Sequence, residues 1–136
     1  MKEYVLDANA LVRLYRDAPG AGTVENLIRQ ARSGNAHLAI SVINLSEAAC
    51  VLAKYLGTDK TLRCIEATRG AIEIVAVWER QAVDTAMLRL RYKLGLADSF
   101  AAELAMRTGA TLVTADPDFA KLGKRLKVLA LPRHSA

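Results

Sequence analysis

Short apolar segments that suit β-strands alternate along this chain with longer segments that have a helical pattern. Between the strand candidates, apolar residues recur at the three- and four-residue spacing of an amphipathic helix. Such alternation favours a parallel sheet, because right-handed crossover helices return the chain to the same end of the sheet. The strand candidates are Lys2–Leu6, His37–Ile40, Ile72–Val77, Thr111–Thr114 and Lys127–Leu131.

The helical segments end at recognisable stop signals. Pro19-Gly20 stops the first helix, and Gly57, Gly70 and Gly95 close later ones. The predicted helices are Asn9–Arg16, a segment around 24–31, Ile43–Leu56, Thr58–Arg69, a segment around 82–94 and Leu96–Arg107. We therefore predict a three-layer α/β/α sandwich with a mainly parallel five-stranded sheet.

Length and composition limit the chain to one folded domain. The 136 residues are 52% hydrophobic and 24% charged, which excludes a disordered chain and predicts a single domain over residues 1–136. The net charge is +5. From Phe119 onward the chain has five basic residues and no acids, so the excess positive charge lies at the C-terminal end. This bias favours a polyanionic partner.

The sequence predicts a cytoplasmic protein without a membrane segment. Glu3 and Asp7 interrupt the first residues, where a signal peptide would need an apolar region. No run of 18 apolar residues is present. Cys50 and Cys64 lie in helical patterns without metal-ligand spacing, so we expect two buried, reduced thiols.

Two acidic residues directly follow predicted strands. Asp7 ends the first strand and Asp116 follows the fourth. The carboxyl ends of parallel strands meet at one edge of the sheet, where α/β proteins bind ligands, so the two carboxylates converge if these strands are neighbours. Alternatively, each aspartate only begins a loop or caps the next helix. The spacing leaves both interpretations open.

Two more acids stand at unexpected places on predicted helices. Glu47 has the apolar neighbours Ile43, Cys50 and Val51 on a helix that is apolar nearly all round, so we expect this helix to be buried. Glu47 would then meet a cation or line a polar cleft, the alternative being an ordinary surface position. Asp98, near the start of the last long helix, is either an N-cap or a ligand.

Four carboxylates in one place would need a cation. At ~5 Å and an effective dielectric constant of about 20, each like-charge pair costs about 3 kcal/mol. A domain with a typical stability of about 5–15 kcal/mol cannot keep such a cluster empty and fully ionised. All-oxygen ligands without histidine or cysteine suit Mg²⁺ or Mn²⁺.

These residues, in this order, resemble the PIN-domain family and, within it, the VapC-type toxin ribonucleases of toxin–antitoxin pairs. The matching pieces are Tyr4-Val5-Leu6-Asp7-Ala8-Asn9, Ser46-Glu47-Ala48, Leu96-Ala97-Asp98-Ser99-Phe100-Ala101-Ala102 and Leu112-Val113-Thr114-Ala115-Asp116-Pro117-Asp118-Phe119. The resemblance implies a PIN-like α/β/α fold. It also implies that the catalytic and metal-binding residues are Asp7, Glu47, Asp98 and Asp116, which bind Mg²⁺ or Mn²⁺.

The resemblance assigns secondary roles to three further residues. Thr114 would be the hydroxyl that positions a carboxylate or a water beside the last aspartate. Asp118 would add a secondary ligand or only fix the turn before Phe119. Asn9 stands where the family commonly has serine or threonine, so its role is open.

The resemblance further implies hydrolysis of RNA phosphodiester bonds by a metal-activated water, leaving a 5′-phosphate and a 3′-hydroxyl. The implied partners are RNA, a cognate antitoxin protein and a second copy of the chain in a homodimer. On the helix around 82–94, Leu88 lies off the apolar stripe and is a candidate interface residue. Candidates for contacts with the RNA backbone are Arg13, Arg89, Arg91, Lys93 and the basic C-terminal residues.

Two other functions compete with the nuclease. A Mg²⁺-dependent small-molecule phosphohydrolase or phosphotransfer protein would use Asp7 as nucleophile, and a phosphoryl group trapped on Asp7 would identify it. A non-catalytic module that binds RNA or protein would keep its biological activity when Asp98 or Asp116 is replaced by asparagine.

Overall fold

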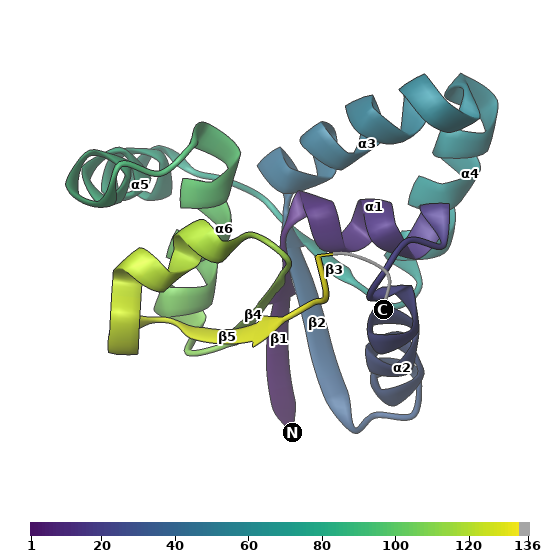
Figure 1. Cartoon of the computed structure of the whole chain (residues 1–136), viewed down its shortest axis with the longest axis horizontal. Coiled ribbons are helices and arrows are strands. Elements are labelled where there is room, and N and C mark those ends of the chain that lie inside the picture. Colours follow the sequence, from purple (N-terminus) through teal and green to yellow (C-terminus); the bar gives the residue numbers. More distant parts are fainter. Residues whose placement is uncertain (134–136) are drawn as a thin grey trace.

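The computed structural model describes residues 1–133 and contains one all-parallel sheet (Figure 1). The strand order is β3-β2-β1-β4-β5. The strands are β1 (Lys2–Leu6), β2 (Ala36–Ser41), β3 (Glu73–Val75), β4 (Thr111–Thr114) and β5 (Lys127–Ala130). The predicted five-stranded parallel sheet is therefore confirmed, and only the third strand is markedly shorter than its apolar segment.

Helices connect successive strands and follow the predicted bounds closely. They are α1 (Ala8–Arg16), α2 (Ala21–Arg32), α3 (Val42–Leu56), α4 (Thr58–Arg69), α5 (Glu79–Tyr92) and α6 (Leu96–Thr108). A 3₁₀ helix that was not predicted, η1 (Pro117–Arg125), follows β4 and is kinked at Gly123. Its start was detectable, because Asp116 caps a helix whose first residue is proline. No helix within residues 1–133 is long and apolar enough to cross a membrane.

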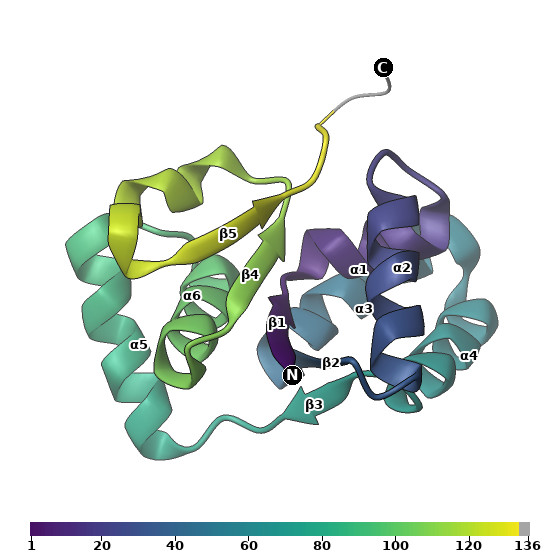
Figure 2. The same cartoon turned by 90° about the horizontal axis from the view of Figure 1, so that it is seen from below.

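The sheet is packed on both faces, which gives the three layers of the fold (Figures 1 and 2). Neighbouring residues of a strand point to opposite faces. Leu6 and Val113 therefore join a core with α1, α2 and α3, whereas Val5 and Leu112 join a second core with α6 and η1. The alternation along β1 and β4 is what allows two short strands to serve both cores.

The packing of α5 differs from the packing that its apolar stripe predicts. Leu88, which lies off the apolar stripe, packs against the second core, while Val83, Met87 and Leu90 on the stripe are 55%, 59% and 76% exposed. The reason is that α5 packs against α6 and reaches the sheet only indirectly, with Thr85 as its one fully buried residue among those described. The stripe, and not Leu88, is the exposed apolar surface of this helix.

The strand order fixes where a ligand site can form. From the central strand β1 the chain first adds β2 and β3 on one side, and later adds β4 and β5 on the other side. The direction of winding changes between β1 and β4, which pair directly, with Leu6 opposite Val113. In such sheets a crevice opens at the carboxyl ends of the two strands that flank this point. Asp7 follows one of these strand ends and Asp116 lies just beyond the other.

Candidate active site

A cavity of about 490 Å³ opens at the carboxyl edge of β1 and β4. All four acids singled out in the sequence line it, and each comes from a different part of the fold. Asp7 follows β1, Glu47 lies on α3, Asp98 lies on α6 and Asp116 follows β4. The tertiary structure thus brings together four carboxylates that are up to 109 residues apart in the chain.

Asp7 is held rigidly at the bottom of the cavity. Its side chain is buried, Oδ1 accepts a hydrogen bond from the Ala10 backbone N–H at 2.8 Å, and Oδ2 accepts one from the Thr114 hydroxyl. Asp7 therefore caps α1 and also faces the cavity, so its two sequence-based interpretations are compatible. Burial raises the pKa of Asp7 to about 6, although the hydrogen bonds from Thr114 and Ala10 act in the opposite direction.

Asp98 does not cap α6. The N-cap is Gly95, and Asp98 lies in the first helical turn, where its carboxylate is favoured by the helix dipole. Burial raises the pKa of Asp98 to about 7, and the nearby charges of Asp116 and Asp7 and a hydrogen bond with Asp116 contribute to this rise. Asp98 therefore holds its proton more readily than an ordinary aspartate when no cation is bound.

Glu47 lies at the exposed side of the cavity, because α3 is not buried all round as the sequence suggested. One face of α3 packs inward through Ala48 and Leu52. Its other face is at the surface, where Glu47 and Cys50 are exposed. Cys50 and Cys64 are free thiols, but Cys64 is only half-buried, so the expectation of two buried cysteines was wrong.

The three secondary residues take different positions. Thr114 is buried, donates to Asp7 and accepts a hydrogen bond from the Asp116 backbone N–H at 3.0 Å. Asn9 lines the cavity, and its Oδ1 accepts a hydrogen bond from Arg13 Nε at 2.8 Å. The backbone N–H of Asp118 donates to Asp116 Oδ1 at 2.9 Å, which fixes the turn before the buried Phe119. The Asp118 side chain is exposed and does not line the cavity.

The donor set suits a hard divalent cation. It consists of carboxylate oxygens without histidine or cysteine, which favours Mg²⁺ or Mn²⁺ over Zn²⁺. Within residues 1–133, no three acidic, histidine or cysteine side chains are close enough together to hold an ion by themselves. This arrangement still fits Mg²⁺, because Mg²⁺ commonly uses one or two carboxylates and completes its shell with water and substrate phosphate. The pKa values of Asp7 and Asp98, raised first by burial and also by neighbouring carboxylates, give the same indication, since a bound cation would favour their ionised forms.

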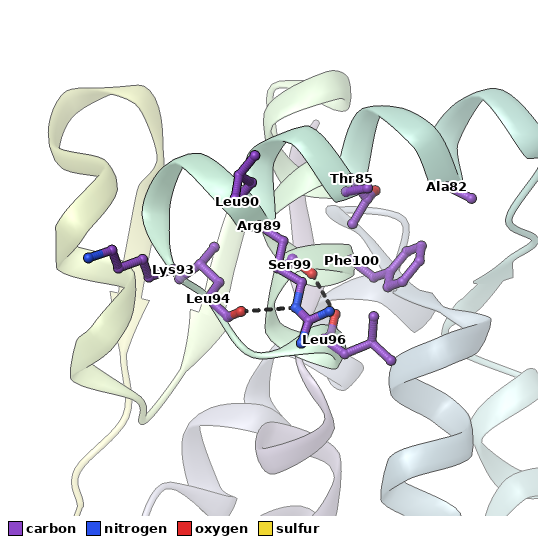
Figure 3. A pocket seen from close by; sticks show the side chains of 10 residues that line it. Ala82, Thr85, Arg89, Leu90, Lys93, Leu94, Leu96, Ser99 and Phe100 are labelled. Atoms are coloured by element: carbon purple, nitrogen blue, oxygen red, sulfur yellow. Dashed lines mark hydrogen bonds between the residues drawn. The ribbon is translucent and has the colours of Figure 1, made fainter.

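A second cavity, of about 550 Å³, lies between α5 and α6 (Figure 3). Its lining is mainly apolar and contains no carboxylate among the described residues. Leu90, Leu96 and Phe100 line it, and Arg89 Nε donates to the Leu94 carbonyl at 3.3 Å at one end. The charged residues of this lining are the bases Arg89 and Lys93, whereas the acids singled out in the sequence all line the cavity at the carboxyl edge.

Comparison with known proteins identifies the family. The family model described as "PIN domain" matches residues 4–125, which include all four acids of the cavity. The chain belongs to the PIN-domain family. The resemblance inferred from the sequence is thereby confirmed. A search of curated protein sequences found no match to this PIN domain.

Solved structures with the same fold cover nearly the whole PIN domain. VapBC2 from Rickettsia felis, solved with a DNA fragment from its promoter, matches with a TM-score of 0.75 and 22% identity, covering 96% of this chain and 99% of that chain. DNA-bound VapBC from Salmonella typhimurium matches with a TM-score of 0.73 and 20% identity, covering 96% and 98%. VapC20 from Mycobacterium tuberculosis, described as a sarcin–ricin loop cleaving toxin, matches with a TM-score of 0.71 and 14% identity, covering 95% and 99%. At these identities the likeness concerns the fold.

Proposed function

We propose that this PIN domain is a metal-dependent endoribonuclease that acts as the toxin of a toxin–antitoxin pair. The observation that carries the proposal is the convergence of four carboxylates, from four separate elements, in one cavity at the point where the sheet changes its winding direction. The similar folds of VapBC proteins and of an RNA-cleaving VapC toxin support the choice of substrate.

The residues that line the cavity would have different roles in this activity. One or two of the carboxylates of Asp7, Asp98 and Asp116 would hold Mg²⁺ or Mn²⁺, with water and substrate phosphate completing its shell, and Glu47 lies at the exposed side. When bound, such an ion supplies a water of lowered pKa and neutralises charge on the phosphoryl group that is attacked. Thr114 and the Ala10 N–H fix the orientation of Asp7 through its two oxygens. Asp98, whose pKa of about 7 lies near neutrality, would bind a cation in its ionised form.

RNA is the substrate that fits the charge of the protein. Four carboxylates repel a phosphodiester as long as no cation is present, so substrate binding and cation binding are coupled. The net charge of +5 and the acid-free C-terminal end attract a polyanion to the molecule. We place this activity in the cytoplasm, where RNA and reduced thiols coexist.

We also propose a cognate antitoxin protein as a partner. The structurally similar proteins include toxin–antitoxin complexes, among them VapBC-1 from nontypeable Haemophilus influenzae and a complex from Klebsiella pneumoniae. A nuclease of this kind requires a specific inhibitor in the cell that produces it, and a bound protein that covers the acidic cavity would serve this purpose.

The exposed stripe of α5 fits a second copy of the chain, which extends the proposal to a homodimer. Val83, Met87 and Leu90 follow a four- and three-residue spacing, and Leu90 also lines the apolar cavity of Figure 3. Both acids of α5 lie in its N-terminal half, whereas its last turn is basic. Two antiparallel α5 helices related by a two-fold axis would therefore pair opposite charges at both ends of an apolar contact.

Cleavage of 5′-labelled RNA tests the proposed activity. Purified protein is incubated with Mg²⁺, Mn²⁺ or EDTA, beside the variants Asp98→Asn and Asp116→Asn. Asp84→Asn is the matched control, because Asp84 is an exposed aspartate on α5 that does not line the cavity. We expect cleavage that requires a metal, leaves 5′-phosphate ends, persists in Asp84→Asn and is lost in the two cavity variants. Cleavage that continues in EDTA or in both cavity variants would refute the proposed mechanism.

A further inference from the structure

The last described residues of the chain are anchored at the acidic cavity. We refer to residues 131–133 as the C-terminal tail. The Leu131 backbone N–H donates to the carbonyl of Thr114 at 2.7 Å, and the Leu131 side chain is buried in the core beneath α1 and α2. Thr114 is also the residue that donates to Asp7. The tail therefore starts from the same strand end that carries the candidate active site.

Arg13 on α1 holds the backbone of this tail. Its guanidinium donates to the carbonyl oxygens of Pro132 and Arg133, the latter at 3.4 Å, and to the Pro19 carbonyl at 2.8 Å. Its Nε donates to Asn9 Oδ1. A guanidinium has only five N–H donors, so these contacts leave little of Arg13 for a phosphate. The geometry favours a positioning role for Arg13 over the RNA contact that its charge suggested.

Asn9 belongs to the same network. It lies one helical turn before Arg13, and its amide oxygen fixes the guanidinium from the side of the cavity. The open question of why asparagine stands at this position thus has a structural answer. Asn9 orients Arg13, and Arg13 in turn holds the tail.

Arg133 is the residue that this network places at the cavity. It lines the cavity together with the four carboxylates, and it also lines an adjoining cavity of about 230 Å³ next to Asp116 and Pro117. Its side chain is exposed. Within residues 1–133, no acidic side chain lies at ion-pair distance from Arg133. Arg133 is therefore an exposed arginine at a carboxylate cavity, and its guanidinium remains available to a ligand.

A phosphate group is the ligand that fits this position. The carboxylates repel a phosphodiester, and a fixed positive charge beside them offsets that repulsion for the part of the strand outside the metal site. Arginine binds phosphate through two parallel N–H donors, so it also orients the group that it binds. The tail is fixed at three backbone atoms, so only the side chain of Arg133, and not the loop that carries it, has to be ordered when the substrate arrives.

We propose that Arg133 binds a backbone phosphate of the RNA strand next to the phosphodiester that is cleaved, and that Arg13 and Asn9 are positioning residues that hold Arg133 there. This inference rests on the proposed ribonuclease function. It adds a part of the site that lies outside the PIN-domain match, which ends at residue 125.

Binding of RNA tests the role of Arg133. The affinity of the full chain for a fluorescein-labelled single-stranded RNA is measured by fluorescence anisotropy over a range of salt concentrations, in the Asp98→Asn background so that the RNA stays intact. We expect Arg133→Ala to weaken binding about 10-fold, as expected for the loss of a hydrogen-bonded ion pair. The slope of log Kd against log salt should fall by about 0.7, the contribution of one phosphate contact on a single strand.

Two further variants separate this role from general charge effects. Arg133→Lys keeps the charge and should keep most of the salt slope while losing part of the affinity, because lysine lacks the planar fork. Arg69→Ala, which removes an exposed arginine on α4, should change neither quantity. Since Arg133 is exposed, none of these substitutions removes a side chain from the core.

A double-mutant cycle tests the positioning role of Arg13. Arg13→Ala should weaken RNA binding to a similar extent as Arg133→Ala, and the double variant should be little weaker than either one. Residues that act only through each other give such non-additive losses, whereas a purely structural effect of Arg13 would add to that of Arg133. Arg13→Lys serves in its place if Arg13→Ala does not fold.

The outcomes distinguish this inference from the function on which it rests. If the unmodified chain binds and cleaves RNA while Arg133→Ala keeps the same affinity and salt slope, the role of Arg133 is overturned and the proposed function remains. If the unmodified chain neither binds nor cleaves RNA, the proposed function fails and the role of Arg133 fails with it. An additive double variant overturns the positioning role of Arg13.

Discussion

Replacing Asp98 with asparagine should make the metal-free protein more stable at pH 8. The folded structure raises the pKa of Asp98 from 3.8 to about 7, so the folded state favours the protonated carboxyl. Such a group contributes stability below pH 3.8, and this contribution is lost as the pH rises through about 7. Asparagine has nearly the same shape and does not ionise, so the variant avoids this loss.

The size of the effect follows from the same pKa values. A rise from 3.8 to about 7 corresponds to about 4 kcal/mol at pH 8. Asp98 is partly exposed, and water screens its repulsion from the other acids, so about half of this, ~2 kcal/mol, is the expected gain. For a domain of this length, the gain corresponds to an increase of about 6 °C in Tm.

Chemical denaturation in EDTA at a series of pH values measures this difference. The free energy of unfolding of Asp98→Asn minus that of the unmodified protein should be near zero at pH 4 and should grow toward pH 8. Added Mg²⁺ should then stabilise the unmodified protein more than the variant, because only the former has the full set of carboxylates. Asp84→Asn, whose side chain is 60% exposed, should differ from the unmodified protein by less than about 0.5 kcal/mol at every pH.

Equal stability of the unmodified protein and Asp98→Asn at pH 8 in EDTA would refute a destabilising ionisation of Asp98. It is also refuted if their difference is as large at pH 4 as at pH 8, since a difference independent of pH cannot come from the ionisation of Asp98.

Three further predictions concern other parts of the structure. Thr114→Val removes the hydroxyl that donates to Asp7, so it should cost about 1.5–3 kcal/mol of stability at pH 8 and raise the pKa of Asp7 above 6, as measured by denaturation and NMR titration. Gly20→Ala should lower the free energy of unfolding by about 1–2 kcal/mol, because Gly20 has φ +92° and an added Cβ would lie 3.1 Å from Leu131 Cβ. Gly22→Ala within α2 should raise it by about 0.5–1 kcal/mol. Thermal melts in which both variants shift Tm in the same direction would contradict this. Leu90→Glu should convert the dimer into a monomer, as measured by light scattering after gel filtration. Leu62→Glu, at an exposed leucine on α4, should leave the dimer intact. A dimer mass that is unchanged in Leu90→Glu would exclude a dimer contact through α5.

The sequence predicted the sheet well because local patterns determine its elements. Strands such as β1 and β4 have the predicted bounds, and the glycines after α3 and α4 end those helices where expected. The apolar pattern of a helix was less informative about which element that helix packs against. The stripe on α5 has the spacing of a core-facing helix, but nothing in its spacing reveals that α6, and not the sheet, is the element against which α5 packs.

The candidate active site also combines features that the sequence determines with features that only the packing of remote segments determines. The sequence by itself determined which residues are unusual, because a carboxylate at a strand end or on an apolar helix is costly wherever it lies. It also determined that the four acids follow the order of the PIN-domain pattern. Only the tertiary structure decided that these acids line one cavity, that Gly95 caps α6 in place of Asp98, and that Arg13 holds a tail 119 residues later. The physical reason is that helical and strand periodicity arise from local backbone geometry, whereas charge repulsion, hydrogen bonds and burial depend on distances that are set only when remote segments pack together.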